Sequence, residues 1–305
     1  MQTNHIIDAT ILNDFFSTIS TDSGYITPKA LQTGSYTTNS TLLTISEETV
    51  YHLLNRLKPT ATGPDGLPAW YIRMGAPFFL RPLSILFTRT LVESTAPNQW
   101  RSATIMPLNK VPAPESPKDF RPISITSILS RIFEPILISR LIYPAITGYQ
   151  GKELTFSDQF AFRPTGSTNA AIITLIHKIT SMLVTEPYVR LICLDFSKAF
   201  DSVKHITIFD KLECLPVRNW IVNFFDHRTH KTRYNDKLSA AVSINASVIQ
   251  GSALGPALFS VFASDLQPIT KGNEMLKYAD DTYLLIPYSN RDTCTNEIAN
   301  MYTYT

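Results

Sequence analysis

The chain has 305 residues, of which 44% are hydrophobic and 17% charged, a composition typical of a globular protein with about two or three packed subdomains. No apolar run approaches the ~20 residues of a membrane span, and the polar start is unlike a signal peptide. Three widely spaced cysteines without a C-x-x-C pattern indicate neither a disulfide framework nor a zinc site. We therefore expect an intracellular protein that does not bind membranes.

The net charge of +2 is unevenly distributed along the chain. Residues 1–50 carry one Lys and five acidic residues, residues 51–190 carry fifteen basic and eight acidic residues, and residues 191–305 carry eleven basic and twelve acidic residues. A basic middle suits a protein that binds a polyanion, and an acidic last third suits one that holds cations. Solvated surface charge explains so modest a bias about as well.

The first elements follow from local signals. Residues 1–45 are rich in Thr, Ser and Asn after a short helical signal at 11–19, and we expect a flexible lead-in. A helix is predicted after Ser46, which can cap a first turn that contains Glu47 and Glu48.

Apolar periodicity predicts two further helices, over residues 82–92 and 125–141, the second with a kink at Pro135. Residues 103–110 and 119–124 indicate short extended segments around a proline-rich loop.

The second half of the chain mixes helices and strands irregularly, which predicts an α+β fold. The expected elements are a helix from Ser167, a buried strand at 189–194, a helix near 206–213, paired strands around Arg233 and Ser247, and a helix opened by Pro256. Two histidines, His227 and His230, lie close to Asp226 without a nearby cysteine, and they indicate an exposed basic loop rather than a metal site.

The stretch "MLKYADDTYLLI" places Asp280 and Asp281 side by side in an apolar, strand-forming segment. Burial of unpaired carboxylates is costly, so folding stability gives no reason for the pair. Asp195 follows the expected buried strand and could meet the tip of this hairpin. The three carboxylates would then suit Mg²⁺, and two such ions are the apparatus for phosphoryl transfer. Taken alone, each aspartate also suits a simple turn.

Motifs along the whole chain resemble those of non-LTR (LINE-type) retrotransposon reverse transcriptases. "LDFSKAFDSV", "VIQGSALGPALF" and "YADD" are similar to successive palm motifs, in order and in separation. Upstream, "TGPDGLPAWYI" resembles the N-terminal extension motif of that family, "PLNK" with "DFRPIS" the first fingers motif, and "DQFAFRPTGST" the second. The resemblance covers roughly residues 10–300.

The resemblance implies a role for each matching residue. Asp195, Asp280 and Asp281 would be the catalytic metal ligands for two Mg²⁺ ions, or Mn²⁺ in their place. Phe200 would exclude a 2′-hydroxyl, or simply fill the core, or both. The remaining implied roles are nucleotide binding by Lys110, Arg121, Gln250 and Gly251, and template binding by Gln159, Arg163, Gly166, Ser167 and Thr168. The competing interpretations are solvated surface charges for Lys110 and Arg121, a plain strand-to-helix turn at Gln250 and Gly251, and capping of the next helix by residues 166–168.

The resemblance also implies an organisation: a flexible lead-in or linker (1–45), the N-terminal extension and fingers (46–185), and a palm with a small antiparallel sheet packed on helices (186–305). We expect the thumb and endonuclease of the family to lie outside this chain. The implied function is RNA-directed DNA polymerisation from dNTPs, with an RNA template and a DNA primer as partners. The alternatives are an inactive RNA-binding remnant and, less well matched because of Phe200, an RNA-directed RNA polymerase.

Overall fold

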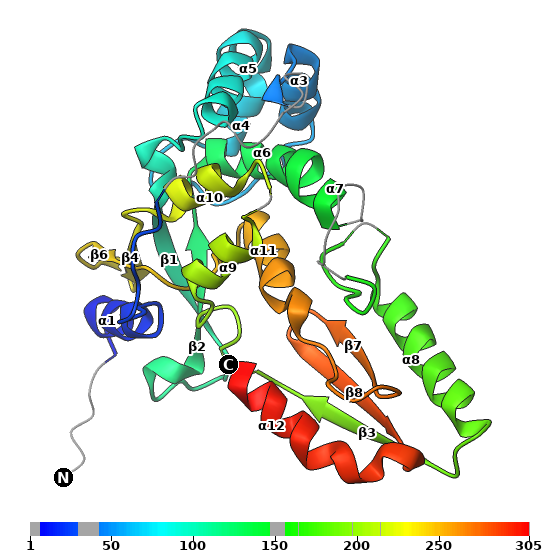
Figure 1. Ribbon diagram of the computed structural model, residues 1–305. Coiled ribbons are helices and arrows are strands. Elements are labelled where there is room, and N and C mark those ends of the chain that lie inside the picture. The colour runs from blue at the N-terminus through cyan, green and yellow to red at the C-terminus, as the bar shows by residue number, and fades with distance from the viewer. Residues whose placement is uncertain are drawn as a thin grey trace, which may run out of the picture. The chain divides into compact units, whose positions relative to one another are not determined.

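The structure is a computed structural model that describes residues 7–29, 43–146, 156–163, 165–196, 198–213 and 215–304. The chain forms two compact units, each made of two stretches of sequence (Figure 1). Unit 1 contains residues 1–142 and 200–255, and unit 2 contains residues 143–199 and 256–305. Each unit therefore takes segments from both sides of the boundary expected at residue 185. No helix of the described residues is long and apolar enough to cross a membrane.

Unit 1 is built on a five-stranded sheet in the order β2-β1-β4-β5, with β6 paired to β4. Its strands are β1 (Ser102–Asn109), β2 (Phe120–Ile125), β4 (Thr229–Tyr234), β5 (Lys237–Leu238) and β6 (Val242–Ser243). β1 and β2 are antiparallel, with Leu108 opposite Arg121, which confirms the two extended segments predicted around the proline-rich loop. β4 pairs in parallel with β1, so the sheet joins segments that are distant in sequence.

Unit 1 also contains most of the helices of the N-terminal half of the chain. Its described helices are α1 (Ala9–Ile19), α3 (Glu47–Asn55), α4 (Ala69–Met74), α5 (Ala76–Val92), α6 (Ile128–Leu137), α9 (His205–Lys211) and α10 (Arg218–Phe225), with the short turns η2 (Asn98–Arg101), η3 (Pro117–Asp119) and η4 (Ile138–Ile142). α3 begins as predicted, because the Ser46 side chain accepts a hydrogen bond from the Thr49 N–H. α6 continues through Pro135 and then widens into the π-helical turn η4.

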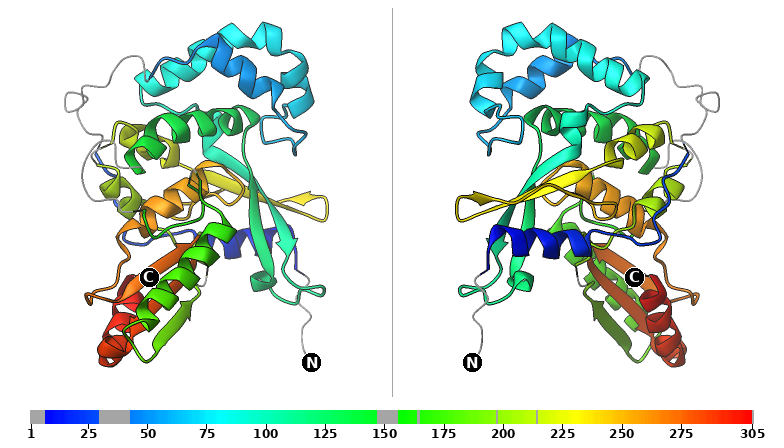
Figure 2. Two further views of the ribbon diagram at one scale, coloured as in Figure 1. Left: turned by 90° about the vertical axis from the view of Figure 1, so that its right-hand side faces the viewer. Right: turned by 90° about the vertical axis from the view of Figure 1, so that its left-hand side faces the viewer.

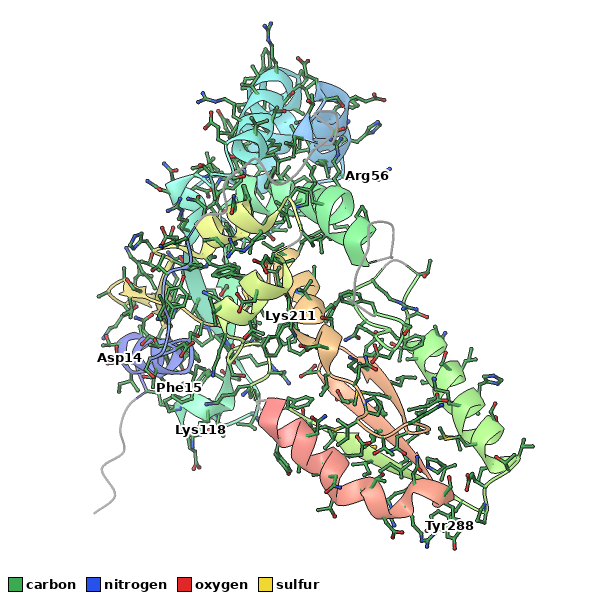
Figure 3. All side chains as sticks on the ribbon, in the orientation of Figure 1. Asp14, Phe15, Arg56, Lys118, Lys211 and Tyr288 are labelled. Atoms are coloured by element: carbon green, nitrogen blue, oxygen red, sulfur yellow. The ribbon has the colours of Figure 1, made fainter. Side chains whose placement is uncertain are left out.

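Helix α1 lies in the segment that was expected to be flexible. The Asp8 side chain caps its N-terminus, and Leu12 and Phe16 pack into a buried cluster with residues of the β1–β2 hairpin. Asp14 is exposed on the same helix (Figure 3). The helical signal is therefore confirmed, and the helix itself is packed against the hairpin. The remainder of the lead-in, residues 1–6 and 30–42, lies outside the described residues.

Unit 2 contains a three-stranded antiparallel sheet in the order β3-β8-β7. Its elements are α7 (Tyr143–Ile146), α8 (Thr168–Leu183), β3 (Val189–Leu194), most of α11 (Leu254–Phe262), η5 (Ala263–Asp265), β7 (Glu274–Tyr278), β8 (Asp281–Pro287), η6 (Tyr288–Thr293) and α12 (Cys294–Tyr304). α8 starts where predicted, with the Ser167 side chain accepting from the Ala170 N–H. The expected small antiparallel sheet packed on helices is confirmed.

The two faces of this sheet pack against different helices (Figure 2). On one face, Met275 and Leu284 form a buried cluster with Met301 of α12. On the other, Leu276 packs with Ala171 of α8 and with Phe160. Consecutive strand residues point to opposite faces, so the sheet needs apolar residues at adjacent positions. This explains why β7 and β8 form a nearly continuous apolar run around the aspartate pair.

The strand predicted at residues 189–194 is confirmed as β3, but the prediction that it is buried is wrong. β3 lies at the edge of the sheet with β8 as its neighbour, and Leu191 is 41% exposed. Its alternate residues, Ile192 and Leu194, pack against the buried cluster on the α12 side. The apolar composition of the strand therefore does not indicate burial on both faces.

The expected exposed basic loop around His227 and His230 is only half correct. His227 is exposed, whereas His230 lies within β4 and is 3% exposed. Strand alternation explains the difference, because the inward-facing position of β4 happens to be a histidine.

Candidate active site

The aspartate pair lies at the tip of the β7–β8 hairpin. Tyr278 pairs with Asp281, so Ala279 and Asp280 are the two residues of the turn. Ala279 has a φ of 58°, a left-handed conformation that is uncommon for a residue with a Cβ atom. Asp281 opens β8 and is exposed, whereas Asp280 is partly buried. The stretch therefore forms a hairpin turn, and that turn presents both carboxylates at the end of the sheet.

Asp195 reaches the same end of the sheet from β3. The register of β3 against β8 ends with Leu194 opposite Thr282, and Asp195 is the next residue. Continued antiparallel pairing would set it against Asp281, and paired Cα atoms in such strands lie about 4.5–5.5 Å apart. The chain thus brings the ends of two distant segments together at this edge.

The electrostatics of Asp280 show that this carboxyl senses the charges of the other two aspartates. Burial raises the pKa of Asp280, and the negative charges of Asp281 and Asp195 raise this pKa further, while a backbone hydrogen bond lowers it. A carboxylate with this environment gains from any positive charge placed among the three.

The donor set fits Mg²⁺, because three carboxylates supply the hard oxygen ligands that this ion prefers and a cation would relieve their repulsion. Among the described residues, however, no three His, Cys, Asp or Glu side chains are already grouped closely enough to hold a metal ion. Binding would therefore require the carboxylates at this end of the sheet to turn toward a shared ion. Asp195 is exposed and follows the last residue of its strand, so it has room to do so.

Gln159, expected to contact the template, is instead occupied within the chain. It is 2% exposed, and its side-chain oxygen accepts hydrogen bonds from the N–H groups of Ala161 and Ala279. Its side-chain nitrogen donates to the Ala279 carbonyl. A buried amide with these partners has its hydrogen bonds satisfied within the chain, and its contact with a template stays a prediction.

The other four residues expected at the template have structural contacts as well. The Arg163 guanidinium donates to the Phe156 carbonyl at 2.6 Å and lies over the Phe160 ring. A Cβ atom on Gly166 would lie 2.2 Å from the Phe160 carbonyl oxygen, so a larger residue does not fit.

At the start of α8, the Ser167 side chain caps the helix and Thr168 Oγ1 lies 2.8 Å from the Tyr278 hydroxyl. The alternative interpretation, helix capping, thus describes Ser167. Both side chains are exposed, so they also remain accessible to a template.

The residues expected to bind the nucleotide gather in unit 1. The Gln250 carbonyl accepts a hydrogen bond from the Ser124 N–H of β2. Gly251 has a φ of 106°, and a Cβ atom there would lie 2.7 Å from the Ser124 carbonyl oxygen. Glycine is therefore required both by backbone conformation and by the close approach of two backbones. Phe200 joins the same region, because its carbonyl accepts from the Val248 N–H.

The two expected phosphate-binding residues lie on the β1–β2 hairpin. Arg121 is exposed on β2, opposite Leu108, and Lys110 is exposed just after β1. The Lys110 ammonium donates to the Lys118 carbonyl at 3.0 Å, which leaves two further N–H groups on that nitrogen. Both positive charges are accessible from solvent.

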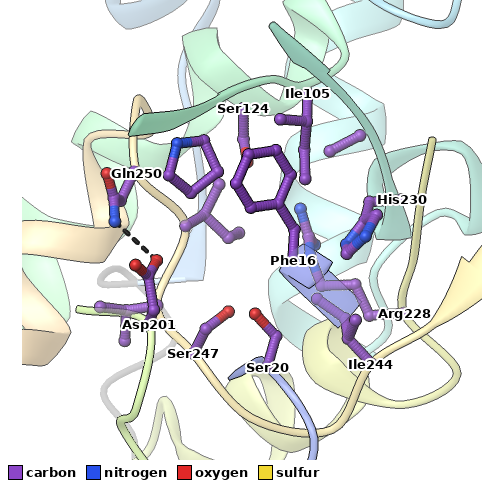
Figure 4. Close-up of a pocket in the computed structure, with 14 residues that line it drawn as sticks. Phe16, Ser20, Ile105, Ser124, Asp201, Arg228, His230, Ile244, Ser247 and Gln250 are labelled. Carbon is purple, nitrogen blue, oxygen red and sulfur yellow. Dashed lines mark hydrogen bonds between the residues drawn. The ribbon is translucent and has the colours of Figure 1, made fainter. Parts of the chain in front are cut away.

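A small cavity of about 30 Å³ opens beside Gln250, enough for one or two water molecules (Figure 4). The side chains of Gln250 and Asp201 both line this cavity, and Gln250 donates a 2.6 Å hydrogen bond to the Asp201 carboxylate. Phe16 and Ser20 at the C-terminal end of α1 form part of its wall. The sequence motifs did not indicate that Asp201 or the predicted helix α1 would lie at this cavity, although Asp201 directly follows Phe200 in one of them.

Glu134 is a second residue that the sequence-based interpretation missed. It is 0% exposed, and its carboxylate accepts hydrogen bonds from Ser130 and from the N–H groups of Ala253 and Leu254. Burial raises the pKa of Glu134, whereas these donors and the positive charge of Arg228 lower it. An acidic residue inside the apolar stripe of α6 was the available signal.

Comparison with known proteins gives consistent matches. A family model described as "Reverse transcriptase (RNA-dependent DNA polymerase)" matches residues 109–302. A probable RNA-directed DNA polymerase from transposon BS of Drosophila melanogaster is 31% identical over 71% of this chain and 24% of its own length. The RNA-directed DNA polymerase from mobile element jockey of the same species is 30% identical over 80% of this chain and 28% of its own length.

More distant matches include a Pol polyprotein from the type-1 retrotransposable element R2 of Nasonia vitripennis, which is 29% identical over 67% of this chain and 19% of its own length. A solved structure of telomerase from Candida tropicalis, in complex with a fragment of telomeric RNA, has a TM-score of 0.47 at 11% identity, over 67% of this chain and 38% of that one. The chain spans about a quarter of the length of the curated transposon BS and jockey relatives.

Proposed function

Because this chain belongs to the reverse transcriptase (RNA-dependent DNA polymerase) family, we propose that it forms the fingers and palm of an enzyme that extends a DNA primer with dNTPs on an RNA template. The observation that carries the proposal is the meeting of Asp195 with Asp280 and Asp281 at one end of the β3-β8-β7 sheet. Membership of the family suggests the reaction in which these carboxylates take part. Bound cations would relieve the repulsion that Asp280 experiences from Asp281 and Asp195.

Asp195 and Asp280 are the proposed metal ligands, and Asp281 supports the negative charge of the site. These residues would hold two Mg²⁺ ions, or Mn²⁺ in their place, and the bound ions would supply the positive charge that favours attack by the primer hydroxyl and departure of pyrophosphate. Lys110 and Arg121 offer exposed positive charge to the triphosphate, with the planar fork of arginine suited to phosphate oxygens.

The partners follow from the same proposal. An RNA template and a DNA primer would bind to the basic part of the chain, residues 51–190, which holds fifteen of the 27 Lys and Arg residues. Affinity should then fall steeply between about 50 and 200 mM salt, because phosphate binding releases counterions. Binding that ignores salt, or no binding at low salt, would count against a nucleic-acid enzyme and against a nucleic-acid-binding remnant alike.

The experiment that tests catalysis compares Asp280→Asn with the matched control Asp292→Asn. Asn retains the size of Asp280 and removes the charge that holds the metal ions, so primer extension should fall at least ~10³-fold. Asp292 has 86% of its side chain exposed, and its substitution should leave extension unchanged. Extension is measured with the 305-residue chain and with the same chain fused to the downstream segment of the jockey polymerase.

The outcomes separate the two candidate functions. Mg²⁺-dependent extension that Asp280→Asn abolishes supports the polymerase. Salt-sensitive RNA binding without extension by either protein supports an inactive RNA-binding remnant. Equal extension by Asp280→Asn and its parent would show that the aspartate pair is only a turn.

A further inference from the structure

Residues 158–160, which contain Gln159, run alongside β7 of the β7–β8 hairpin in the way that a further strand would. The Lys277 N–H donates to the Asp158 carbonyl at 2.7 Å, and the Phe160 N–H donates to the Lys277 carbonyl at 2.8 Å. Gln159 and Lys277 thus form a parallel bridge at the outer edge of β7, away from β8. Backbone hydrogen bonds place the Gln159 side chain level with the hairpin turn.

The Gln159 amide then binds both polar groups of one turn residue. Its oxygen accepts from the Ala279 N–H at 3.0 Å, and its nitrogen donates to the Ala279 carbonyl at 3.3 Å. The oxygen also accepts from the Ala161 N–H at 3.1 Å, which fixes the orientation of the amide. A primary amide is the side-chain group that offers a donor and an acceptor in one plane, so it reproduces the pairing of a neighbouring strand.

Ala279 is a residue whose backbone needs such support. Its φ of 58° lies in the left-handed region, which costs energy for a residue with a Cβ atom. It directly precedes Asp280, so its backbone sets the direction in which the Asp280 carboxylate leaves the turn. A change at Ala279 would therefore move Asp280 without altering the carboxylate itself.

A second anchor holds the other side of Tyr278. The Lys277 ammonium lies 2.9 Å from the Asp158 carboxylate and donates to the carbonyls of Ala263 and Leu266. Lys277 is 1% exposed, and these three acceptors use all three of its N–H donors. The Lys277 side chain is thus anchored by contacts that do not involve the Gln159 amide, whose own hydrogen bonds reach the turn at Ala279.

We infer that Gln159 is a positioning residue for catalysis, which holds the Ala279 turn so that Asp280 faces the metal ions, and that it does not bind the template. The inference rests on the proposed function, because it assigns to Asp280 the role of metal ligand. It predicts that Gln159 controls metal affinity and turnover, while RNA affinity is independent of it.

The test uses the 305-residue chain and three variants. Gln159→Met has a similar length and lacks both hydrogen-bonding groups. Gln159→Glu retains the acceptor for the two N–H groups and loses the donor. Gln267→Met is the matched control, because Gln267 donates to the Asp158 carboxylate without contacting Ala279.

The first readout is amide hydrogen exchange at Ala279, which requires neither metal nor activity. Exchange should become about tenfold faster in Gln159→Met, as expected for the loss of one buried hydrogen bond, and stay slow in Gln159→Glu and Gln267→Met. The second is Mn²⁺ binding by electron paramagnetic resonance, which should weaken in Gln159→Met and stay unchanged in Gln267→Met. RNA affinity should remain within about twofold of the parent, because a buried amide adds no counterion release.

Turnover is measured with the jockey-segment fusion, where Gln159→Met should lower kcat and leave the KM for dNTPs unchanged. Loss of RNA affinity with unchanged exchange at Ala279 would overturn the inference and restore Gln159 as a template contact. If Gln159→Met fails to fold, Gln159→Glu takes its place in the test. Exchange at Ala279 that is faster in Gln159→Glu than in the parent would then overturn the inference, because this variant retains the acceptor for the Ala279 N–H. The proposed function requires that the parent chain bind Mn²⁺ and that Asp280→Asn abolish this binding. If either result is not found, the proposed function fails, whatever the exchange at Ala279 shows.

Discussion

The Gln250 side chain donates a 2.6 Å hydrogen bond to the carboxylate of Asp201, the residue that directly follows Phe200. The Phe200 carbonyl in turn accepts from the Val248 N–H, two residues before Gln250. Phe200 and Asp201 are therefore hydrogen-bonded to Val248 and Gln250, respectively. The residue expected to exclude a 2′-hydroxyl and a residue expected to bind the nucleotide thus lie on segments of unit 1 that these hydrogen bonds join.

We expect Phe200→Ala to retain extension with dNTPs and to admit ribonucleotides. The bulk of the ring is the feature proposed to exclude a 2′-hydroxyl, and alanine removes it without touching the backbone bond to Val248. The measurement is the ratio of kcat/KM for dNTP and rNTP with the jockey-segment fusion. Phe196→Ala, which truncates an aromatic residue of the unit 2 core, is the control. It should affect stability and leave this ratio unchanged.

Asp201→Ala should raise the KM for dNTPs by about tenfold or more, because the Gln250 amide loses a hydrogen bond to a charged partner. Asp201→Asn should have a smaller effect, since its amide oxygen can still accept from Gln250. Asp210→Asn, at an exposed position of α9, serves as the control. An equal KM in Asp201→Ala and the parent would show that Gln250 needs no orientation by Asp201.

Local signals in the sequence predict much of this fold. The caps at Ser46 and Ser167 act on groups only three residues away, so the sequence contains everything needed to predict them. The β7–β8 hairpin is local in the same sense, and so is its presentation of Asp280 and Asp281. The position of Asp195 near this hairpin was expected because it follows a strand segment and lies within the motif "LDFSKAFDSV".

Contacts between distant segments were not predictable in this way. Gln159 lies 120 residues from Ala279, and no periodicity or composition signals that its amide turns inward. The edge position of β3 depends on which strands pair with it, and apolar residues are common in edge and central strands alike. The burial of His230 depends on which face of β4 its position occupies, and the basic composition of the segment does not indicate that face.

Unit 1 should lose stability in mild acid because of two buried histidines. Burial is the main cause that lowers the pKa of His205 and of His230 to about 4, and the positive charge of Arg228 lowers both further. His205 Nε2 lies 2.8 Å from the Ser247 carbonyl, and its Nδ1 has no hydrogen-bond partner among the described residues. A second proton on this ring would therefore be buried without compensation.

The sign of the pH effect follows from these pKa values. An unfolded histidine takes up its proton below about pH 6.5, whereas the folded ring stays neutral down to about pH 4. The free energy of unfolding should thus be constant above about pH 6.5 and fall as the pH drops, by ~2 kcal/mol per histidine at pH 5. Denaturant unfolding at pH 5–7 measures this. His230→Leu should remove about half of the slope, and His52→Asn, at an exposed position, none of it. A parent chain with equal stability at pH 5 and pH 7 would contradict the prediction.

Glu134→Gln should destabilise unit 1 by about 3 kcal/mol, since the change leaves the Arg228 charge buried without its counter-charge. Glu93→Gln breaks an exposed Arg–Glu pair on α5 and should cost below about 1 kcal/mol, which makes it the matched control. The measurement is the free energy of unfolding in denaturant, at a pH above 7 where the histidines are neutral in both states. Arg228 is 1% exposed, so the missing charge cannot be replaced by solvent. The double variant Glu134→Leu with Arg228→Leu tests this cause directly.

If the uncompensated charge of Arg228 is the main cost, the double variant should be no less stable than Glu134→Leu alone, because it removes both charges. If loss of the hydrogen bonds from Ala253 and Leu254 is the main cost instead, the two changes should add. The second outcome would also raise the KM for dNTPs in Glu134→Leu, since those N–H groups end the loop that begins with Gln250 and Gly251. A Glu134→Gln variant as stable as the parent would contradict both explanations, and would mean that Glu134 is already protonated in the folded chain.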